Sequence, residues 1–109
     1  MSREPFVQVV ELSWVGTDDE RAPGGAVTEE LCGSIDHEPP CPVAAHFTST
    51  ERRATTLEAR VLFACEPGDE AAVRSRIDTA LARRWQVLTT RRDDLTEAES
   101  EHAERLVVS

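Results

Sequence analysis

Residues 57–84, LEARVLFACEPGDEAAVRSRIDTALARR, decide the predicted fold because they place a strand directly before a helix. Residues 57–65 alternate, and one of their two faces is entirely apolar, which predicts a strand that packs on a core. On the opposite face, Glu58 and Arg60 indicate a solvent-exposed end, whereas Leu62 indicates a buried end. Proline and glycine then interrupt the strand and begin the next element.

The second half of this stretch, residues 69–84, predicts the best-defined helix of the chain. Acidic residues begin it and arginines end it, which suits the dipole of a helix. Its apolar residues recur at helical spacing and form one stripe that can pack against a sheet. These residues are Val73, Ile77, Ala80 and Leu81.

Before this unit, the sequence predicts a strand, a loop and a short helix. Residues 6–15, FVQVVELSWV, are rich in β-branched and aromatic side chains and are largely apolar on both faces, which predicts a central strand. Residues 16–25 contain glycine, proline and acidic residues and predict a loop. Residues 26–32 predict about two turns of helix with Thr28 as its cap, and packing would have to stabilise so short a helix.

The remaining elements complete the predicted order. Residues 43–49, VAAHFTS, alternate as a strand, and the polar residues 50–56 predict the connection of a hairpin. Residues 85–90, WQVLTT, predict the last strand. The sequence TEAE from Thr96 fits a capping box and predicts a terminal helix to about Leu106.

Together these elements predict a single α+β domain over residues 1–109, in the order β-α-β-β-α-β with a short C-terminal helix. This is the split βαβ, ferredoxin-like arrangement, in which two helices cover one face of a four-stranded antiparallel sheet. The strands carry apolar residues on both faces, so the second face also needs a cover. Homodimerisation through the open face, or docking of the terminal helix, would supply it.

The composition narrows the classes of function. A net charge of −9 disfavours nucleic-acid binding, although the arginine-rich middle of the chain leaves a local anion site open. No apolar segment is long enough for a membrane span or a signal peptide, which predicts a cytoplasmic protein. The odd number of cysteines makes a disulfide framework unfavourable in that compartment. All the basic residues are arginine, as in a bacterium with GC-rich genes.

The unusual part of the chain is CGSIDHEPPCPVAAH, residues 32–46. Thiolate and imidazole are the ligands that zinc prefers, and Cys32, His37, Cys41 and His46 offer the four that a structural site requires. Prolines stiffen this segment, which would lower the entropy lost when it closes around an ion. A three-ligand site completed by a nearby carboxylate or water is a variant that would permit catalysis.

Other interpretations stay open. His46 and Arg60 could act on a small molecule at the open face of the sheet, as an enzyme or a ligand-binding domain. Cys41 with a histidine could form a nucleophilic pair. The acidic residues 93–104 could bind a basic protein partner. Without a function, Cys32 and Cys65 would be core residues, and His37 and His102 would be exposed. The sequence therefore predicts a non-catalytic binding or structural module with a zinc site, and these interpretations are its alternatives.

Overall fold

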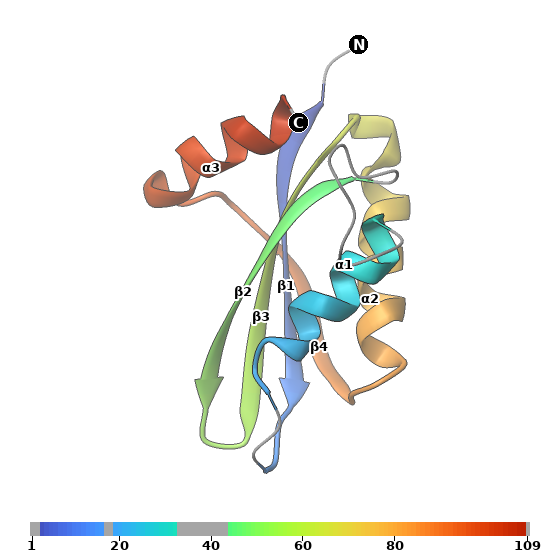
Figure 1. The fold of residues 1–109 in the computed structure, drawn as a ribbon, viewed down its shortest axis with the longest axis vertical. Helices are drawn as coiled ribbons and strands as arrows, with labels where there is room; N and C mark the ends of the chain where they lie inside the picture. The colour runs from blue at the N-terminus through green and yellow to red at the C-terminus, as the bar shows by residue number, and fades with distance from the viewer. Residues whose placement is uncertain (1–2, 17–18, 33–43, 109) are drawn as a thin grey trace.

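The structure, a computed structural model, describes residues 3–16, 19–32 and 44–108 (Figure 1). Four strands and three α-helices form it, in the order β-α-β-β-α-β-α. A short 3-10 turn, η1 (Pro67–Asp69), precedes the second helix. The bounds are β1 (Glu4–Ser13), α1 (Ala22–Cys32), β2 (Ala45–Arg53), β3 (Thr56–Cys65), α2 (Glu70–Ala82), β4 (Val87–Asp93) and α3 (Glu97–Val107).

The four strands form one antiparallel sheet in the order β2-β3-β1-β4. The long pairing of β1 with β3 runs from Glu4 opposite Cys65 to Ser13 opposite Thr56. As predicted, the N-terminal strand β1 is central, and β2 and β4 lie at the two edges of the sheet. The α+β class and the four-stranded antiparallel sheet are confirmed.

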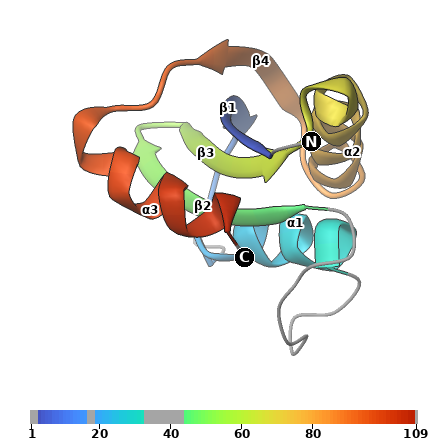
Figure 2. The ribbon, with the colours of Figure 1, turned by 90° about the horizontal axis from the view of Figure 1, so that it is seen from above.

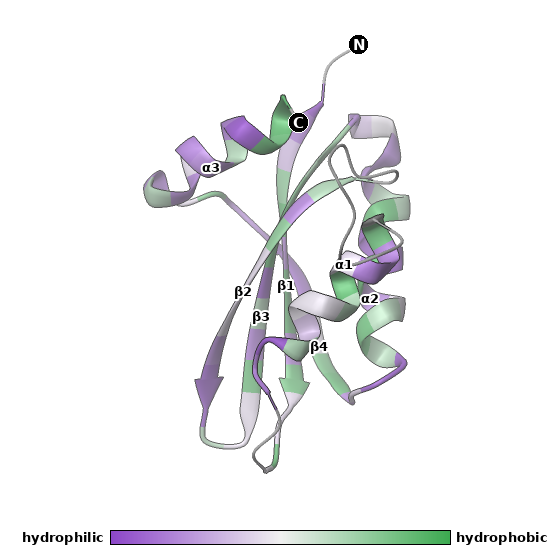
Figure 3. Ribbon diagram, viewed as in Figure 1, coloured by the Kyte–Doolittle hydropathy of each residue, from purple (hydrophilic) through white to green (hydrophobic). Residues whose placement is uncertain are grey.

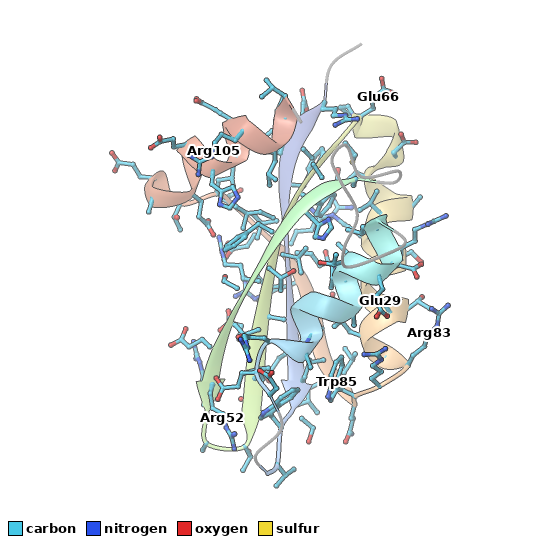
Figure 4. All side chains as sticks on the ribbon, in the orientation of Figure 1. Glu29, Arg52, Glu66, Arg83, Trp85 and Arg105 are labelled. Atoms are coloured by element: carbon cyan, nitrogen blue, oxygen red, sulfur yellow. The ribbon has the colours of Figure 1, made fainter. Side chains whose placement is uncertain are left out.

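The main core lies between the sheet and the helices α1 and α2, which both pack on one face (Figures 1 and 2). Side chains that point from β1 and β3 toward these helices are fully buried, and they contact the predicted apolar stripe of α2. The largest of them are Phe63, Leu12 and Leu57, and Trp14, which directly follows β1, belongs to the same core. Two ion pairs, Arg84–Glu29 at 3.3 Å and Arg83–Glu30 at 3.5 Å, join the residues that follow α2 to α1. Figure 4 labels one residue of each pair, Glu29 and Arg83.

The terminal helix α3 covers part of the second face. Its buried residues Ala103 and Leu106 pack there, and Leu106 contacts a smaller apolar cluster of β1, β2 and β3. This cluster includes Val7, Val9 and Leu62. The far half of this face carries charged side chains, and Figure 3 shows the end of β2 as hydrophilic. The terminal helix, one of the two predicted covers, therefore covers the apolar half of this face.

Several boundaries differ from the prediction, since β1 ends at Ser13 and β4 covers Val87–Asp93, and two of the differences are instructive. Helix α1 begins at Ala22, inside the predicted loop, so Thr28 lies in the interior of the helix and does not cap it. Strand β2 continues to Arg53, and only residues 54–55 form the turn of the hairpin. In both cases packing against a neighbouring element extends a segment whose local sequence favours a loop.

A buried polar network links α2 to the sheet. Arg74 donates hydrogen bonds to Glu70 at 2.7 Å, to the Val7 carbonyl at 2.8 Å and to the Gln8 side chain. Gln8 in turn donates to Asp78 at 2.9 Å. Because buried polar groups need partners, this network restricts how α2 can sit on the sheet.

None of the helices in the described ranges has the length and apolar character that crossing a membrane would require.

Candidate functional site at the junction of α1 and β2

The structure brings the two ends of the Cys/His segment to one region. Cys32 is the last residue of α1, and Ala44 directly precedes β2, the strand that contains His46. Helix α1 packs against β2. His37, Cys41 and the side chain of Cys32 lie outside the part of the chain that the structure describes.

The imidazole ring of His46 points from β2 toward α1. Its Nδ1 lies 3.0 Å from the Ala44 carbonyl, and its Nε2 lies 3.0 Å from the Thr28 hydroxyl. A carbonyl can only accept, so Nδ1 carries the proton and the Nε2 lone pair of the neutral ring accepts from Thr28. Burial lowers the pKa of His46 below its ordinary value, and the hydrogen bond to Ala44 opposes this more weakly. The ring is therefore held neutral in one tautomer.

Beside this ring lies a small pocket of about 240 Å³, which Gly24, Thr28, His46, Phe47 and Thr48 line. Gly24 lies beside Thr48, and a methyl group placed on it would meet Cβ of Thr48 at an ordinary contact distance of 3.5 Å. The Thr48 hydroxyl is buried and has no hydrogen-bond partner among the described residues. Leaving such a group unpaired costs about 1–3 kcal/mol.

Arg60, the other predicted ligand-binding residue, lies on the opposite face of the sheet. In the register of β2 and β3, His46 is opposite Phe63 and Ser49 is opposite Arg60. Phe63 belongs to the core under α1 and α2, and Arg60 points the other way, toward α3. The structure therefore does not bring His46 and Arg60 together, and His46 lies on the covered face, not on the open one.

Arg60 holds α3 in place. Its guanidinium donates to both carboxylate oxygens of Glu99, at 2.7 and 2.9 Å, and to Asp93 at 2.6 Å. It also donates to the Asp94 carbonyl at 2.8 Å. Hydrogen bonds from Arg60 lower the pKa of Glu99 to about 2 and that of Asp93 to about 2. With these acceptors around it, Arg60 has a structural role in docking the helix.

Cys65 and His102, the remaining cysteine and histidine of the described ranges, both pack against other side chains. Cys65 is buried in the main core, as expected. His102 on α3 is half-buried and not exposed as expected, and its ring packs at a tilt against that of Phe47, with ring centroids 4.4 Å apart, across the sheet from His46. Within the described ranges, no three His, Cys, Asp or Glu side chains gather as a metal site would require.

The two threonines of the pocket, Thr28 and Thr48, were not predicted as site residues. Thr48 lies two residues after His46 in β2, so the two side chains are on the same face of the strand. The sequence pattern could have indicated this. No sequence pattern indicated Thr28 as the partner of His46, because that contact depends on how α1 lies across β2.

No protein-family model matches this chain, and the searches of curated proteins and of solved structures found no match either. The interpretation of the site therefore depends on its geometry alone.

Proposed function

We propose that this protein is a small non-catalytic module that binds a metal ion, zinc, at the junction of α1 and β2. The ligands would be Cys32, His37, Cys41 and His46, which together complete a tetrahedral set. In this proposal the ion ties the segment between α1 and β2 to the edge of the sheet. Its role is structural or in binding, and no catalytic step is assigned to it.

The observation that carries this proposal is the state of His46. A histidine that binds a metal is neutral and usually donates its other ring N–H to a carbonyl or a carboxylate. His46 makes this second hydrogen bond, with Nδ1–H donated to Ala44, and its Nε2 lone pair points at α1. The Thr28 hydroxyl now occupies this lone pair, so an ion would have to displace it.

The position of Cys32 adds support. Thr28 precedes Cys32 by four residues, about one turn of α1, so the backbone of Cys32 lies one turn beyond the partner of His46. Only residues 33–43 separate the end of α1 from Ala44. The other two proposed ligands, His37 and Cys41, belong to this segment.

Elemental analysis and cobalt substitution test this proposal directly. A Cys65→Ala background removes the core thiol, so that a thiol reagent reports only on Cys32 and Cys41. We expect about one zinc ion per chain, in keeping with a four-ligand site, and protection of both thiols until a chelator is added. Cobalt(II) in the same site should give the intense near-ultraviolet absorption of thiolate coordination.

His46→Gln and His102→Gln form a matched pair, because the two rings lie on opposite faces of β2. Loss of one ligand should weaken zinc binding roughly tenfold or more in His46→Gln, whereas His102→Gln should bind as the parent does. Metal-free protein whose thiols react freely, and whose unfolding midpoint does not change in chelator, would overturn the proposal.

We further infer that the fold is of the ferredoxin-like type. Its support is the β-α-β-β-α-β order together with β1 and β3 at the centre of the sheet. Homodimerisation, a basic protein partner and a cytoplasmic location stay predictions from the sequence.

A further inference from the structure

The outer edge of β4 is open within the part of the chain that the structure describes. In the order β2-β3-β1-β4, β1 pairs with one side of β4 and no described strand pairs with the other, and Figure 2 shows β4 as the outermost strand. Its residues 88–93 are all exposed. We propose that this edge binds an extended acidic segment of another protein, which adds to the sheet as a further strand beside β4.

The backbone of β4 directs every second residue toward the open edge. Ser13, at the end of β1, donates its N–H at 2.9 Å to the carbonyl of the residue just before β4. Backbone groups alternate between the two sides of a strand, so every second residue of β1 counted from Ser13, including Val9, bonds to β4. The one irregular step in this pairing places its extra residue in β4, so the alternation along β1 continues. Val9 is opposite Arg91, whose N–H and carbonyl therefore point inward, and those of Thr90 and Arg92 point outward.

These outward groups can bond to the backbone of an added strand, and the two arginines of β4 can select its side chains. Arg91 pairs with Asp93 at 3.4 Å and with Glu58 at 3.7 Å, and Arg92 pairs with Glu70 on α2 at 3.7 Å. All three distances exceed the length of about 2.7–2.9 Å of a strong charge-assisted hydrogen bond. The side chains of Arg91 and Arg92 are 54% and 72% exposed, so an incoming carboxylate can reach both guanidinium groups.

The positions of Arg91 and Arg92 on opposite faces of the sheet define the segment that fits. Successive side chains of an added strand also point to opposite faces, so two adjacent acidic residues can reach one arginine each. A basic segment would place like charges opposite the arginines, which is unfavourable. A second copy would bring its own arginines to the edge and a net charge of −9 that repels the first copy. A short segment with two acidic residues carries little of this repulsion.

This inference does not rest on the proposed metal site. His46 lies on β2, which is the opposite edge of the sheet from β4. Metal content and peptide binding can therefore be measured separately, and the failure of one proposal leaves the other standing.

Titration of the full chain with short peptides tests the inference, with amide chemical shifts as the readout. The probe is acetyl-VTVEEVTV-amide, whose valines and threonines favour a strand and whose two glutamates are adjacent. Matched peptides carry QQ or KK in place of EE. We expect saturable binding of the EE peptide, roughly three- to tenfold weaker binding of the QQ peptide, and none of the KK peptide. Added salt should weaken the binding of the EE peptide, because it screens exposed charge pairs.

Hydrogen exchange locates the bound peptide. The amides of Thr90 and Arg92 should exchange quickly in the free protein and slowly when the EE peptide binds. The amide of Arg91 should exchange slowly in both states, because its N–H already bonds to β1. An EE peptide that is N-methylated at its valines and threonines keeps both charges but loses most of its backbone donors, so it should show no saturable binding.

Arg91→Gln and Arg92→Gln each remove one exposed guanidinium, and Arg21→Gln, in the exposed residue that precedes α1, is the control. The first two should each weaken binding of the EE peptide roughly two- to fivefold, and the control should bind as the parent does. Equal binding of the EE and KK peptides, no saturable binding of the EE peptide, or binding without slower exchange at Thr90 and Arg92 would overturn the inference. A dimeric mass of the free protein with these two amides already protected would overturn it as well, because a second copy would then occupy the edge.

Discussion

The attachment of α3 to the sheet depends on Arg60, and replacing it with methionine tests how much. Arg60→Met keeps an unbranched apolar stem but removes four hydrogen bonds, to Glu99, Asp93 and the Asp94 carbonyl. The side chains of Arg60 and Glu99 are each only 19% exposed. Hydrogen bonds to charged groups contribute about 1.5–3 kcal/mol when protected, and exposed ion pairs about 0–1 kcal/mol, so for this partly exposed cluster we expect a loss of about 2 kcal/mol.

The pH dependence of this loss separates the ion pair from simple packing. The pKa of Glu99 is lowered from 4.5 to about 2, chiefly by the hydrogen bonds from Arg60 and to a smaller extent by those of Thr96. A carboxyl group whose pKa is lower in the folded state stabilises the protein above its unfolded pKa, and this stabilisation disappears as the pH falls through the folded pKa. The free-energy difference between the parent and Arg60→Met should therefore be complete at pH 7 and should shrink as the pH falls from about 4.5 to about 2.

Urea unfolding at several pH values measures this difference, and hydrogen exchange locates it. We expect the amides of α3 to lose protection before those of β1 and β3, because the helix opens locally. The control is Arg21→Met, which removes an exposed ion pair with Asp19 and should leave stability unchanged. A difference that stays constant from pH 7 to pH 2, or equal protection of α3 in both proteins, would refute this explanation of the docking.

Two further predictions concern the core. Arg74→Met leaves the Gln8 side chain and the Val7 carbonyl without a buried donor, so it should cost about 3 kcal/mol in urea unfolding, and a loss below about 1 kcal/mol would mean that water replaces the arginine. Trp14→Phe removes a buried indole N–H that has no partner in the described residues, and this gain should largely offset the lost packing. We expect a net change within about 1 kcal/mol in the same assay, and a loss of about 3 kcal/mol or more would show that the indole is hydrogen-bonded.

The sequence determined the features that depend on near neighbours in the chain. The capping box of α3 forms as predicted, since Thr96 and Glu99 are three residues apart and face each other once the helix begins. Alternation along β3 correctly separated the core residues Val61 and Phe63 from the partly exposed Arg60, because successive side chains of a strand point to opposite faces. The apolar stripe of α2 could be predicted in the same way, because its apolar residues recur at the spacing of a helix.

Tertiary structure alone decided which residues from different elements meet. Whether His46 and Arg60 share a face depends on the register between β2 and β3, and a shift of one residue would reverse the answer. The start of α1 at Ala22 goes against the local preference of two glycines, because burial of Val27 and Leu31 stabilises the helix from outside it. The pairing of Thr28 with His46 follows from that packing, since it joins residues 18 apart that no local period relates.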